Sequence, residues 1–388
     1  MTPAARAEAA IGVLDRILAG QPAEQALTNW ARASRFAGSS DRAALRDLVF
    51  DALRCRRSFA ALGGGMTGRG LVLGGLRAAG VDPATVFTGE RHAPAPLTAA
   101  DAGHMPEGDE ALDVPDWLAP RLKESLGPDY AAVMAAMRQR APVFLRANPL
   151  RGSLDAAIAA LARDGVEARP HPLAACALEV VAGARRIQQS AAYLDGLVEL
   201  QDASSQAVVE VLPLADGQKV LDLCAGGGGK TLAMAGRAAL KLWAHDADPR
   251  RMRDLPARAA RAGAVVKITE KPEGSAPYNL ILTDVPCSGS GSWRRDPEGK
   301  WRLTADRLAE LLHLQAAIMD RAAAMLATGG VLAYATCSLL RDENEAQVAA
   351  FLARHDGWTC TLSRRFTPLA GGDGFFVALL SAPAKGAR

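Results

Sequence analysis

Residues 201–388 alternate between short apolar runs and amphipathic stretches. The apolar runs fall near residues 219–223, 242–246, 265–269, 279–283 and 331–336. Such runs are typical of strands in a parallel sheet that helices cover on both faces, so we expect a doubly wound, Rossmann-like α/β sheet. Two last runs, 358–362 and 375–380, have only a loop between them, which predicts an antiparallel pair at the end of this sheet.

The composition is that of an ordinary globular protein. Of 388 residues, 49% are hydrophobic and 22% are charged, and no apolar run reaches the length of a membrane span. The first residues lack the pattern of a signal peptide, so we expect a cytoplasmic protein with no membrane contact. The six cysteines are scattered and none forms a Cys-x-x-Cys pair, which argues against a disulfide scaffold and a bound metal. The net charge of +3 permits a nucleic-acid partner without requiring one.

Residues 1–92 are predicted to be helical throughout. Ile11 and Leu14 mark one face of a first helix, and Ser40 or Asp41 can cap a later one. The stretch contains twelve arginines, no lysine and eight acidic residues. Seven of the arginines crowd together: Arg32, Arg35, Arg42, Arg46, Arg54, Arg56 and Arg57. They form either a solvated helical face or a surface that docks RNA or protein, because guanidinium groups suit phosphates.

The middle of the chain holds a linker and a small module. Pro, Ala, Gly and acidic residues dominate 93–116, which predicts a linker. Residues 117–200 predict an α+β module. Its expected elements are helices on both sides of Gly127-Pro128, a helix over 154–162, and strands near 144–148, 177–181 and 197–200.

A glycine-rich turn follows the first strand of the alternating region. It reads Cys224-Ala225-Gly226-Gly227-Gly228-Gly229-Lys230-Thr231 and opens a helix, so its backbone can approach a ligand closely. It is not a P-loop, because that pattern needs a glycine where Cys224 stands. An NAD site and an S-adenosylmethionine site both remain open, and in either one Asp246 can hydrogen-bond a ribose.

Two cysteines follow adjacent predicted strands. Asp284 and Cys287 end one strand, and Cys337 ends the other. Ligands of open α/β sheets bind beyond the carboxyl ends of the strands, so these side chains fall where chemistry is done. Hydride transfer has no need of two thiols, whereas methylation of a pyrimidine at C5 does. One thiolate adds to C6 and makes C5 nucleophilic, and a second group removes the C5 proton after methyl transfer.

With these motifs the chain resembles the RsmB/Sun-type RNA 5-methylcytosine (m5C) methyltransferases, which act on bacterial 16S rRNA. The matching motifs are Cys224–Thr231, Asp284–Gly291 with residues 294–301, Tyr334–Leu339 and Glu343-Asn344-Glu345. The resemblance is close over about 190–380 and weaker over 117–148. The N-terminal helices are similar to the NusB-like RNA-binding domain of the bacterial rRNA enzymes.

The resemblance implies a role for each matching residue. Cys337 corresponds to the nucleophile on C6, and Cys287 to the thiol needed for product release. Asp284 and Lys230 correspond to catalytic residues beside the cofactor and the base. The residues implied to hold S-adenosylmethionine are Cys224, Ala225, Gly226, Gly227, Gly228, Gly229, Lys230, Asp246, Glu270 and Asp284. At Glu270 the family usually has an aspartate.

The resemblance also implies the layout of the chain. We expect a NusB-like helical RNA-binding domain over 1–92, a linker over 93–116, an RNA-binding module over 117–200 and an S-adenosylmethionine-dependent methyltransferase domain over 201–388. The expected partner is rRNA of the small ribosomal subunit, and the expected state is a monomer.

Several alternatives stay open. The substrate can be tRNA rather than rRNA. The chain can be a non-catalytic RNA-binding or ribosome assembly factor with a relict methyltransferase domain, or an NAD-dependent dehydrogenase. Residues 293–302, which interleave Trp, Arg and Lys, form either part of an RNA channel or a folded structural loop.

Overall fold

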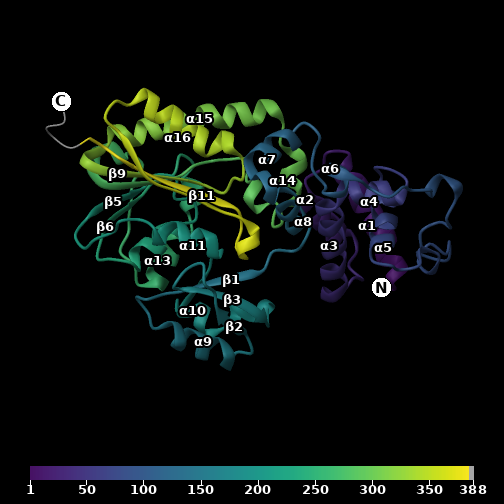
Figure 1. The fold of residues 1–388 in the computed structure, drawn as a ribbon. Coiled ribbons are helices and arrows are strands. Elements are labelled where there is room, and N and C mark those ends of the chain that lie inside the picture. The colour runs from purple at the N-terminus through teal and green to yellow at the C-terminus, as the bar shows by residue number, and fades with distance from the viewer. Residues whose placement is uncertain (384–388) are drawn as a thin grey trace. The chain divides into compact units, whose positions relative to one another are not determined.

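The computed structural model of the chain describes residues 1–383, which form two compact units. Unit 1 contains residues 1–140 together with 293–302, and unit 2 contains residues 141–292 and the described residues from 303 onward. Figure 1 labels the helices and strands of both. Among the described residues, no helix is long and apolar enough to cross a membrane.

Unit 1 is helical. Its helices are α1 (Pro3–Leu18), α2 (Ala23–Ala33), α3 (Ser39–Arg54), α4 (Arg56–Gly63), α5 (Gly68–Ala78), α6 (Gly108–Ala111), α7 (Ala119–Leu126), α8 (Tyr130–Met137) and α14 (Pro297–Arg302). Apolar residues at helical spacing face one core, in which Leu14, Leu45 and Leu71 are fully buried. The prediction of a helical N-terminal region is therefore confirmed, and its NusB-like character stays a prediction.

The start of α3 differs from our expectation. Neither Ser40 nor Asp41 caps this helix, because it begins at Ser39 after Gly38, which has no side chain to accept a hydrogen bond. The carboxylate of Asp41 is used elsewhere. It accepts hydrogen bonds from the amino group of Met1 and from the guanidinium of Arg6, so it joins α3 to α1.

Residues 93–116, the predicted linker, pack against the helices of unit 1. Asp101 forms a bidentate ion pair with Arg69, at 2.7 and 2.9 Å. Asp113 is completely buried and accepts a hydrogen bond from Arg138 at 2.7 Å. A Pro-rich, acidic composition therefore marks a segment with little regular structure beyond α6, and ion pairs of the buried Asp101 and Asp113 hold it against the helices.

Residues 293–302 join unit 1 although they follow the strand that carries Asp284. The indole nitrogen of Trp301 donates to the carbonyl of Leu53 at 2.6 Å, and Nζ of Lys300 donates to that of Arg54 at 3.2 Å. Lys300 is 3% exposed, and burial lowers its pKa to about 8. Of the two interpretations of this segment, the structure favours the folded loop.

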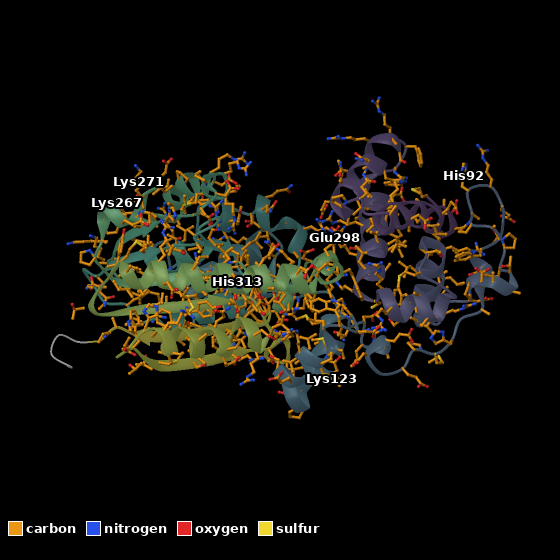
Figure 2. The ribbon with its side chains drawn as sticks, turned by 90° about the horizontal axis from the view of Figure 1, so that it is seen from above. His92, Lys123, Lys267, Lys271, Glu298 and His313 are labelled. Atoms are coloured by element: carbon orange, nitrogen blue, oxygen red, sulfur yellow. The ribbon has the colours of Figure 1, made fainter. Side chains whose placement is uncertain are left out.

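Other side chains of residues 293–302 are also used for contacts within unit 1. Trp293 is 2% exposed and Arg294 is 5% exposed, so neither side chain is available to stack on or pair with RNA. Glu298, labelled in Figure 2, accepts a hydrogen bond from the backbone N–H of Ala23 at the first turn of α2. A carboxylate at a helix N-terminus is stabilising because it faces the positive end of the helix dipole.

Unit 2 begins with a small antiparallel sheet in the order β2-β3-β1-β4. Its strands are β1 (Val143–Ala147), β2 (Glu167–Pro170), β3 (Ala177–Ala182) and β4 (Val198–Leu200), and its helices are α9 (Leu154–Arg163) and α10 (Ala191–Leu194). The sequence predicted β1, β3, β4 and α9 but missed β2, which is an exposed edge strand with no apolar alternation. Helices α7 and α8, which we placed in this module, belong to unit 1.

The large sheet has seven strands in the order β10-β11-β9-β8-β5-β6-β7. They are β5 (Lys219–Asp222), β6 (Lys241–Ala244), β7 (Lys267–Ile268), β8 (Tyr278–Asp284), β9 (Leu326–Thr336), β10 (Thr359–Phe366) and β11 (Phe375–Ser381). Strands β5 to β9 are parallel, and β11 is antiparallel to both β9 and β10. The predicted Rossmann-like sheet with an antiparallel pair at its end is confirmed.

Helices cover both faces of this sheet. They are α11 (Ala203–Glu210), α12 (Gly229–Ala235), α13 (Leu255–Ala262), α15 (Ala305–Ala324) and α16 (Glu345–Arg354). Helices α15 and α16 lie on one side of the sheet, and α11 and α13 lie on the other (Figure 1). The strand expected over 265–269 shrinks to two residues because it lies at the sheet edge, where Val265 is 82% exposed. Lys267 and Lys271 are exposed at this edge (Figure 2).

Candidate active site

The two cysteines meet at one edge of the large sheet. Strands β8 and β9 are parallel neighbours, with Asp284 in register with Ala335, so their carboxyl ends lie together. The loops that follow carry Cys287 and Cys337, and the two sulfur atoms are 3.4 Å apart. The structure therefore brings together two thiols that the sequence separates by fifty residues.

The two thiols are not equivalent. The hydrogen bond with Cys337 and then burial raise the pKa of Cys287 well above its ordinary value. Cys287 therefore keeps its proton at neutral pH and can donate it in a hydrogen bond to the sulfur of Cys337.

Lys230 and Asp284 form an ion pair beside the thiols. Nζ of Lys230 lies 2.6 Å from a carboxylate oxygen of Asp284 and 4.9 Å from the centre of the Phe375 ring. Burial alone lowers the pKa of Lys230, but the charge of Asp284 and the hydrogen bond to it outweigh burial, and the pKa is raised. Lys230 is therefore a permanent cation paired with the side chain of Asp284.

The glycine-rich turn forms one wall of a pocket of about 230 Å³. Its lining includes Cys224, Ala225, Gly226, Gly227, Gly229, Lys230 and Asp284. Gly228 has φ of +80°, and a Cβ atom there would lie 2.2 Å from the Leu255 side chain, so any other residue would be strained and would displace that side chain. Burial and neighbouring carboxylates raise the pKa of Cys224, so this thiol is protonated and lines the pocket without being a nucleophile.

The small sheet also helps to hold this turn. Arg146 on β1 is 5% exposed and donates to the carbonyl of Gly229 at 2.8 Å. It also donates to the side chain of Gln201, which lines the same pocket. A residue of the predicted RNA-binding module thus supports the backbone at the first residue of α12.

Asp246 and Glu270 differ in how they are placed. Asp246 is 4% exposed and accepts a hydrogen bond from the backbone N–H of Gly226 at 2.8 Å, with Arg251 at 3.1 Å. It is therefore tied directly to the glycine-rich turn. Glu270 follows β7 at the sheet surface, where its side chain is exposed, and it is not among the residues that line the pocket. A contact of Glu270 with the cofactor stays a prediction.

Asp222, the last residue of β5, is a pocket residue that the sequence analysis did not single out. One of its carboxylate oxygens accepts a hydrogen bond from Thr231 at 2.6 Å, while the other is buried without a partner. Burial raises its pKa to about 7. An acceptor left without a partner inside a pocket fits a ligand that carries a cationic or N–H group, such as the ammonium group of S-adenosylmethionine.

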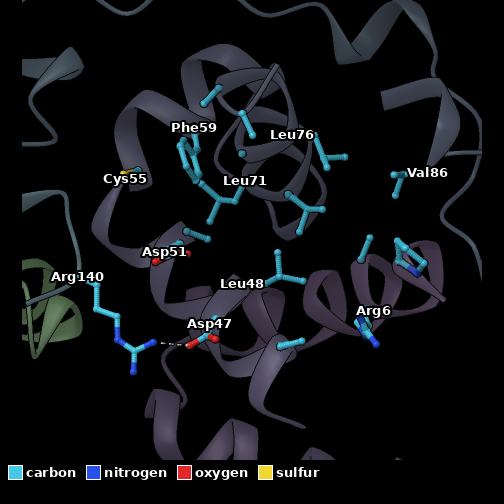
Figure 3. Close-up of a pocket in the computed structure, with 18 of the residues that line it drawn as sticks. Arg6, Asp47, Leu48, Asp51, Cys55, Phe59, Leu71, Leu76, Val86 and Arg140 are labelled. Carbon is cyan, nitrogen blue, oxygen red and sulfur yellow. Dashed lines mark hydrogen bonds and ion pairs between the residues drawn. The ribbon is translucent and has the colours of Figure 1, made fainter. Parts of the chain in front are cut away.

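A larger hollow, of about 910 Å³, lies within unit 1 (Figure 3). Its lining is mostly apolar and comes from α1, α3 and α5, with Arg140 paired to Asp47 at its rim. Cys55 lies in this lining, and burial raises its pKa to about 11. Cys55 is therefore a protonated, buried thiol, and this hollow does not contain the cysteine pair.

Comparison with known proteins identifies the family. Residues 209–381 match the family described as 16S rRNA methyltransferase RsmB/F, and residues 114–185 match the ferredoxin-like domain of RsmF/B-like methyltransferases. Ribosomal RNA small subunit methyltransferase B of Erwinia tasmaniensis is 35% identical over 294 residues, which cover 71% of this chain and 68% of that protein. The chain belongs to the RsmB/F methyltransferase family.

Two further likenesses agree with this assignment. Ribosomal RNA small subunit methyltransferase B of Yersinia pseudotuberculosis is 36% identical over 282 residues, or 68% of this chain. The match spans 65% of the length of that relative. The crystal structure of PH0851 superposes with a TM-score of 0.77 and 24% identity, over 98% of this chain and 99% of that one, which shows a shared fold. The resemblance to RsmB/Sun-type methyltransferases is thus confirmed.

The RsmB/F site contains functional groups that sequence reasoning did not assign. Asp222 ends β5, the first strand of the large sheet along the chain. An acidic residue at the carboxyl end of that strand could have been recognised in the sequence as a candidate ligand-binding residue. Glu343 belongs to the Glu-Asn-Glu motif that supported the resemblance, yet nothing in its spacing reveals that it is buried between the two cysteine loops. For both acidic residues, the burial and the hydrogen-bond partners are known only from the folded structure.

The raised pKa of Asp222 predicts a pH-dependent stability. The folded state holds a proton up to about pH 7, whereas an unfolded aspartate releases it near pH 4, so Asp222 makes folding less favourable as pH rises from about 4 to 7. Asp222→Asn removes this effect. Relative to the wild type, its free energy of unfolding should be almost unchanged at pH 4 and higher by up to about 4 kcal/mol at pH 8.

Urea unfolding of the ligand-free protein at the two pH values measures this difference. Glu270→Gln is the control, because it replaces an exposed carboxylate with an amide just beyond β7. A difference between Asp222→Asn and wild type that is the same at both pH values would contradict the proposed protonation of Asp222.

Proposed function

We propose that this protein transfers a methyl group from S-adenosylmethionine to C5 of a cytosine in RNA. The observation that carries the proposal is the pair of thiols 3.4 Å apart, beside an acid and a glycine-lined pocket. Membership of an rRNA methyltransferase family supports the same reaction. The name of the matched family supports 16S rRNA as the substrate.

Cys337 is the nucleophile in this proposal. Its thiolate adds to C6 of the cytosine, a C6–S bond forms, and the ring electrons make C5 a nucleophile. S-Adenosylmethionine, when bound, supplies the methyl group that C5 takes up. Cys287 supports the attack because its S–H can donate to the Cys337 sulfur before the bond to C6 forms.

Cys287 acts again after methyl transfer. The adduct carries a proton on C5, and this proton has to leave before the C6–S bond can break and release the Cys337 thiolate. Cys287 lies within one hydrogen bond of Cys337 and is the proposed route for that proton. As the C6–S bond breaks, Cys287 passes its own proton to the departing Cys337 thiolate and takes up the C5 proton in its place.

Lys230 and Asp284 orient the base. The side-chain oxygens of Asp284 can accept a hydrogen bond from the exocyclic amino group of cytosine. Lys230 fixes that carboxylate through the ion pair of 2.6 Å and cannot move far, since it is only 7% exposed. The pair thus gives the pocket a preference for a base that presents an N–H donor.

The cofactor site in this proposal comprises Cys224–Lys230, Asp246 and Asp222. The turn offers backbone N–H groups at the start of α12, and Asp246 lies beside it with a carboxylate suited to ribose hydroxyl groups. Asp222 offers the carboxylate oxygen that has no partner in the protein. An NAD-dependent dehydrogenase would leave both thiols without a role, and the family assignment counts against it.

Fewer arginines of unit 1 are available to bind RNA than the count in the sequence indicated. Arg46 pairs with Glu24, Arg54 is 7% exposed and donates to the carbonyl of Arg294, and Arg57 pairs with Asp116. These arginines serve contacts within the protein. A smaller group is exposed where α2 ends and the loop to α3 begins, namely Arg32, Arg35 and Phe36, with Phe36 77% exposed. An exposed aromatic ring flanked by arginines suits a stacked base between phosphates.

Cysteine substitutions test the reaction and the order in which the thiols act. Cys337→Ala should abolish methylation and form no adduct. Cys287→Ala should still attack and transfer the methyl group, then stall with RNA bound covalently to Cys337. A denaturing gel with substrate RNA and S-adenosylmethionine should show a slow protein–RNA band for Cys287→Ala alone, and the double variant should lose it.

Other outcomes of the same gel would show which part of the proposed mechanism is wrong. A band with Cys337→Ala and none with Cys287→Ala would show that the two roles are reversed. Single variants that form no band and methylate RNA at the wild-type rate would exclude thiol catalysis. An intact protein that neither methylates RNA nor forms an adduct would favour the non-catalytic assembly factor.

Single substitutions on the α2–α3 surface test RNA binding. Arg35→Ala should weaken RNA binding and reduce the slope of log K against log salt by about 1, because one phosphate contact is lost. Phe36→Ala should weaken binding by about 1–3 kcal/mol with the slope unchanged, because stacking releases no counterion. Filter binding over a range of salt concentrations measures both quantities.

Arg91→Ala is the matched control. Arg91 is also exposed in unit 1, next to His92, which Figure 2 labels. Equal effects of Arg35→Ala and Arg91→Ala would show that the α2–α3 surface has no special role. Deletion of residues 1–92 is a poorer test, since it also removes the carbonyl groups that hold Lys300 and Trp301.

A further inference from the structure

Glu343 is a buried carboxylate between the two cysteine loops. It is 0% exposed and ends the short helical turn Arg341–Glu343 that follows β9. A buried carboxylate is costly unless hydrogen bonds satisfy its oxygens. Both oxygens of Glu343 accept hydrogen bonds, and the groups that donate to them are neutral.

The donors come from both cysteine loops. Oε1 accepts from the backbone N–H of Ser288 at 2.8 Å, and Oε2 accepts from the hydroxyl of Ser288 at 2.5 Å. Oε2 also accepts from the hydroxyl of Ser338. Ser288 directly follows Cys287, and Ser338 directly follows Cys337. One carboxylate therefore holds the residue next to each thiol.

A second set of hydrogen bonds fixes the carboxylate itself. The side chain of Gln315 on α15 donates to Oε1 of Glu343 and to the carbonyl of Pro286, both at 3.0 Å. The hydroxyl of Tyr334 donates to the backbone carbonyl of Glu343 at 2.5 Å. A buried network in which each oxygen has partners is rigid, so the carboxylate has little freedom to move away from the loops.

We propose that Glu343 is a positioning residue, which ties the residue after each cysteine to one carboxylate and so keeps the two sulfur atoms within reach of each other. The catalytic consequence of this contact rests on the proposed function. The effect of Glu343 on the spacing of the thiols is independent of the proposed function, because that spacing is a property of the two loops. It can be measured without RNA or S-adenosylmethionine.

The charge of Glu343 acts in the same direction as its hydrogen bonds. After the hydrogen bond with Cys337 and burial, it is a further contribution that raises the pKa of Cys287. Loss of this charge would make Cys287 easier to ionise and less able to keep its proton beside Cys337. The hydrogen bonds of Glu343 thus keep the two sulfur atoms close together, and its charge favours the protonated form of Cys287.

The rate at which diamide oxidises the pair depends on the spacing of the two sulfur atoms and on how readily the thiols ionise. Each thiol gives up one electron and one proton, an S–S bond forms, and diamide takes up the two electrons and two protons to become a hydrazine. The wild-type protein should form the Cys287–Cys337 disulfide readily, because the sulfur atoms are already 3.4 Å apart. Mass spectrometry of the peptides identifies this disulfide and gives its rate of formation.

Glu343→Gln is the test variant, and Glu345→Gln is its matched control. Glu345 belongs to the same motif but forms an ion pair with Arg365 at 2.7 Å, away from the two serine hydroxyls. Glu343→Gln should form the disulfide at least tenfold more slowly, and Glu345→Gln at the wild-type rate. In RNA methylation, Glu343→Gln should lower kcat at least tenfold with KM for S-adenosylmethionine within twofold of wild type.

A second variant covers a failure of Glu343→Gln to fold, which near-ultraviolet circular dichroism would reveal. Ser288→Ala combined with Ser338→Ala removes the two hydroxyl donors and leaves the carboxylate in place, and it too should form the disulfide more slowly. The double serine variant keeps the charge of Glu343, so its rate reports on the spacing alone. A wild-type disulfide rate in this folded double variant, or a wild-type protein that does not form the disulfide, would overturn the inference. A slow disulfide in the variants with no RNA methylation by the wild type would support the inference and refute the proposed function.

Discussion

The parallel pairing of β8 with β9 is the interaction on which the site depends. The register that sets Asp284 beside Ala335 brings the ends of both strands to one edge of the sheet, and only there can Cys287 and Cys337 touch. A parallel pair requires a crossover connection, and α15 supplies it. The same helix contributes Gln315 to the loops, so the crossover both creates the pairing and stabilises its result.

The pocket and the thiols are joined by Lys230. It is the second residue of α12, which begins within the glycine-rich turn, and its side chain pairs with the carboxylate at the end of β8. A ligand that moves the backbone of the turn would therefore also move Lys230, and with it the side chain of Asp284. The chain thus connects the expected methyl donor with the expected base through one ion pair of 2.6 Å.

Much of this arrangement could be predicted from the sequence, and the reasons are local. Apolar runs with helical patterns between them reveal a parallel sheet, and Cys287 and Cys337 at strand ends reveal chemistry at its edge. The strand β2 was missed because an exposed edge strand has no apolar alternation. The role of Glu343 could not be predicted, because its partners Ser288 and Gln315 come from other parts of the chain. The arginine cluster misled for the same reason: sequence shows charge but not the ion pairs of Arg46 and Arg57 that use it.

The central claim is that this site makes 5-methylcytosine in RNA, and nucleoside mass spectrometry tests it most directly. The protein is incubated with S-adenosylmethionine carrying an isotopically labelled methyl group and with small-subunit rRNA transcribed in vitro, and the RNA is then digested to nucleosides. The label should appear in 5-methylcytidine, and Cys337→Ala should abolish it. Label in a different nucleoside, or in 5-methylcytidine at an equal level with Cys337→Ala, would contradict the account.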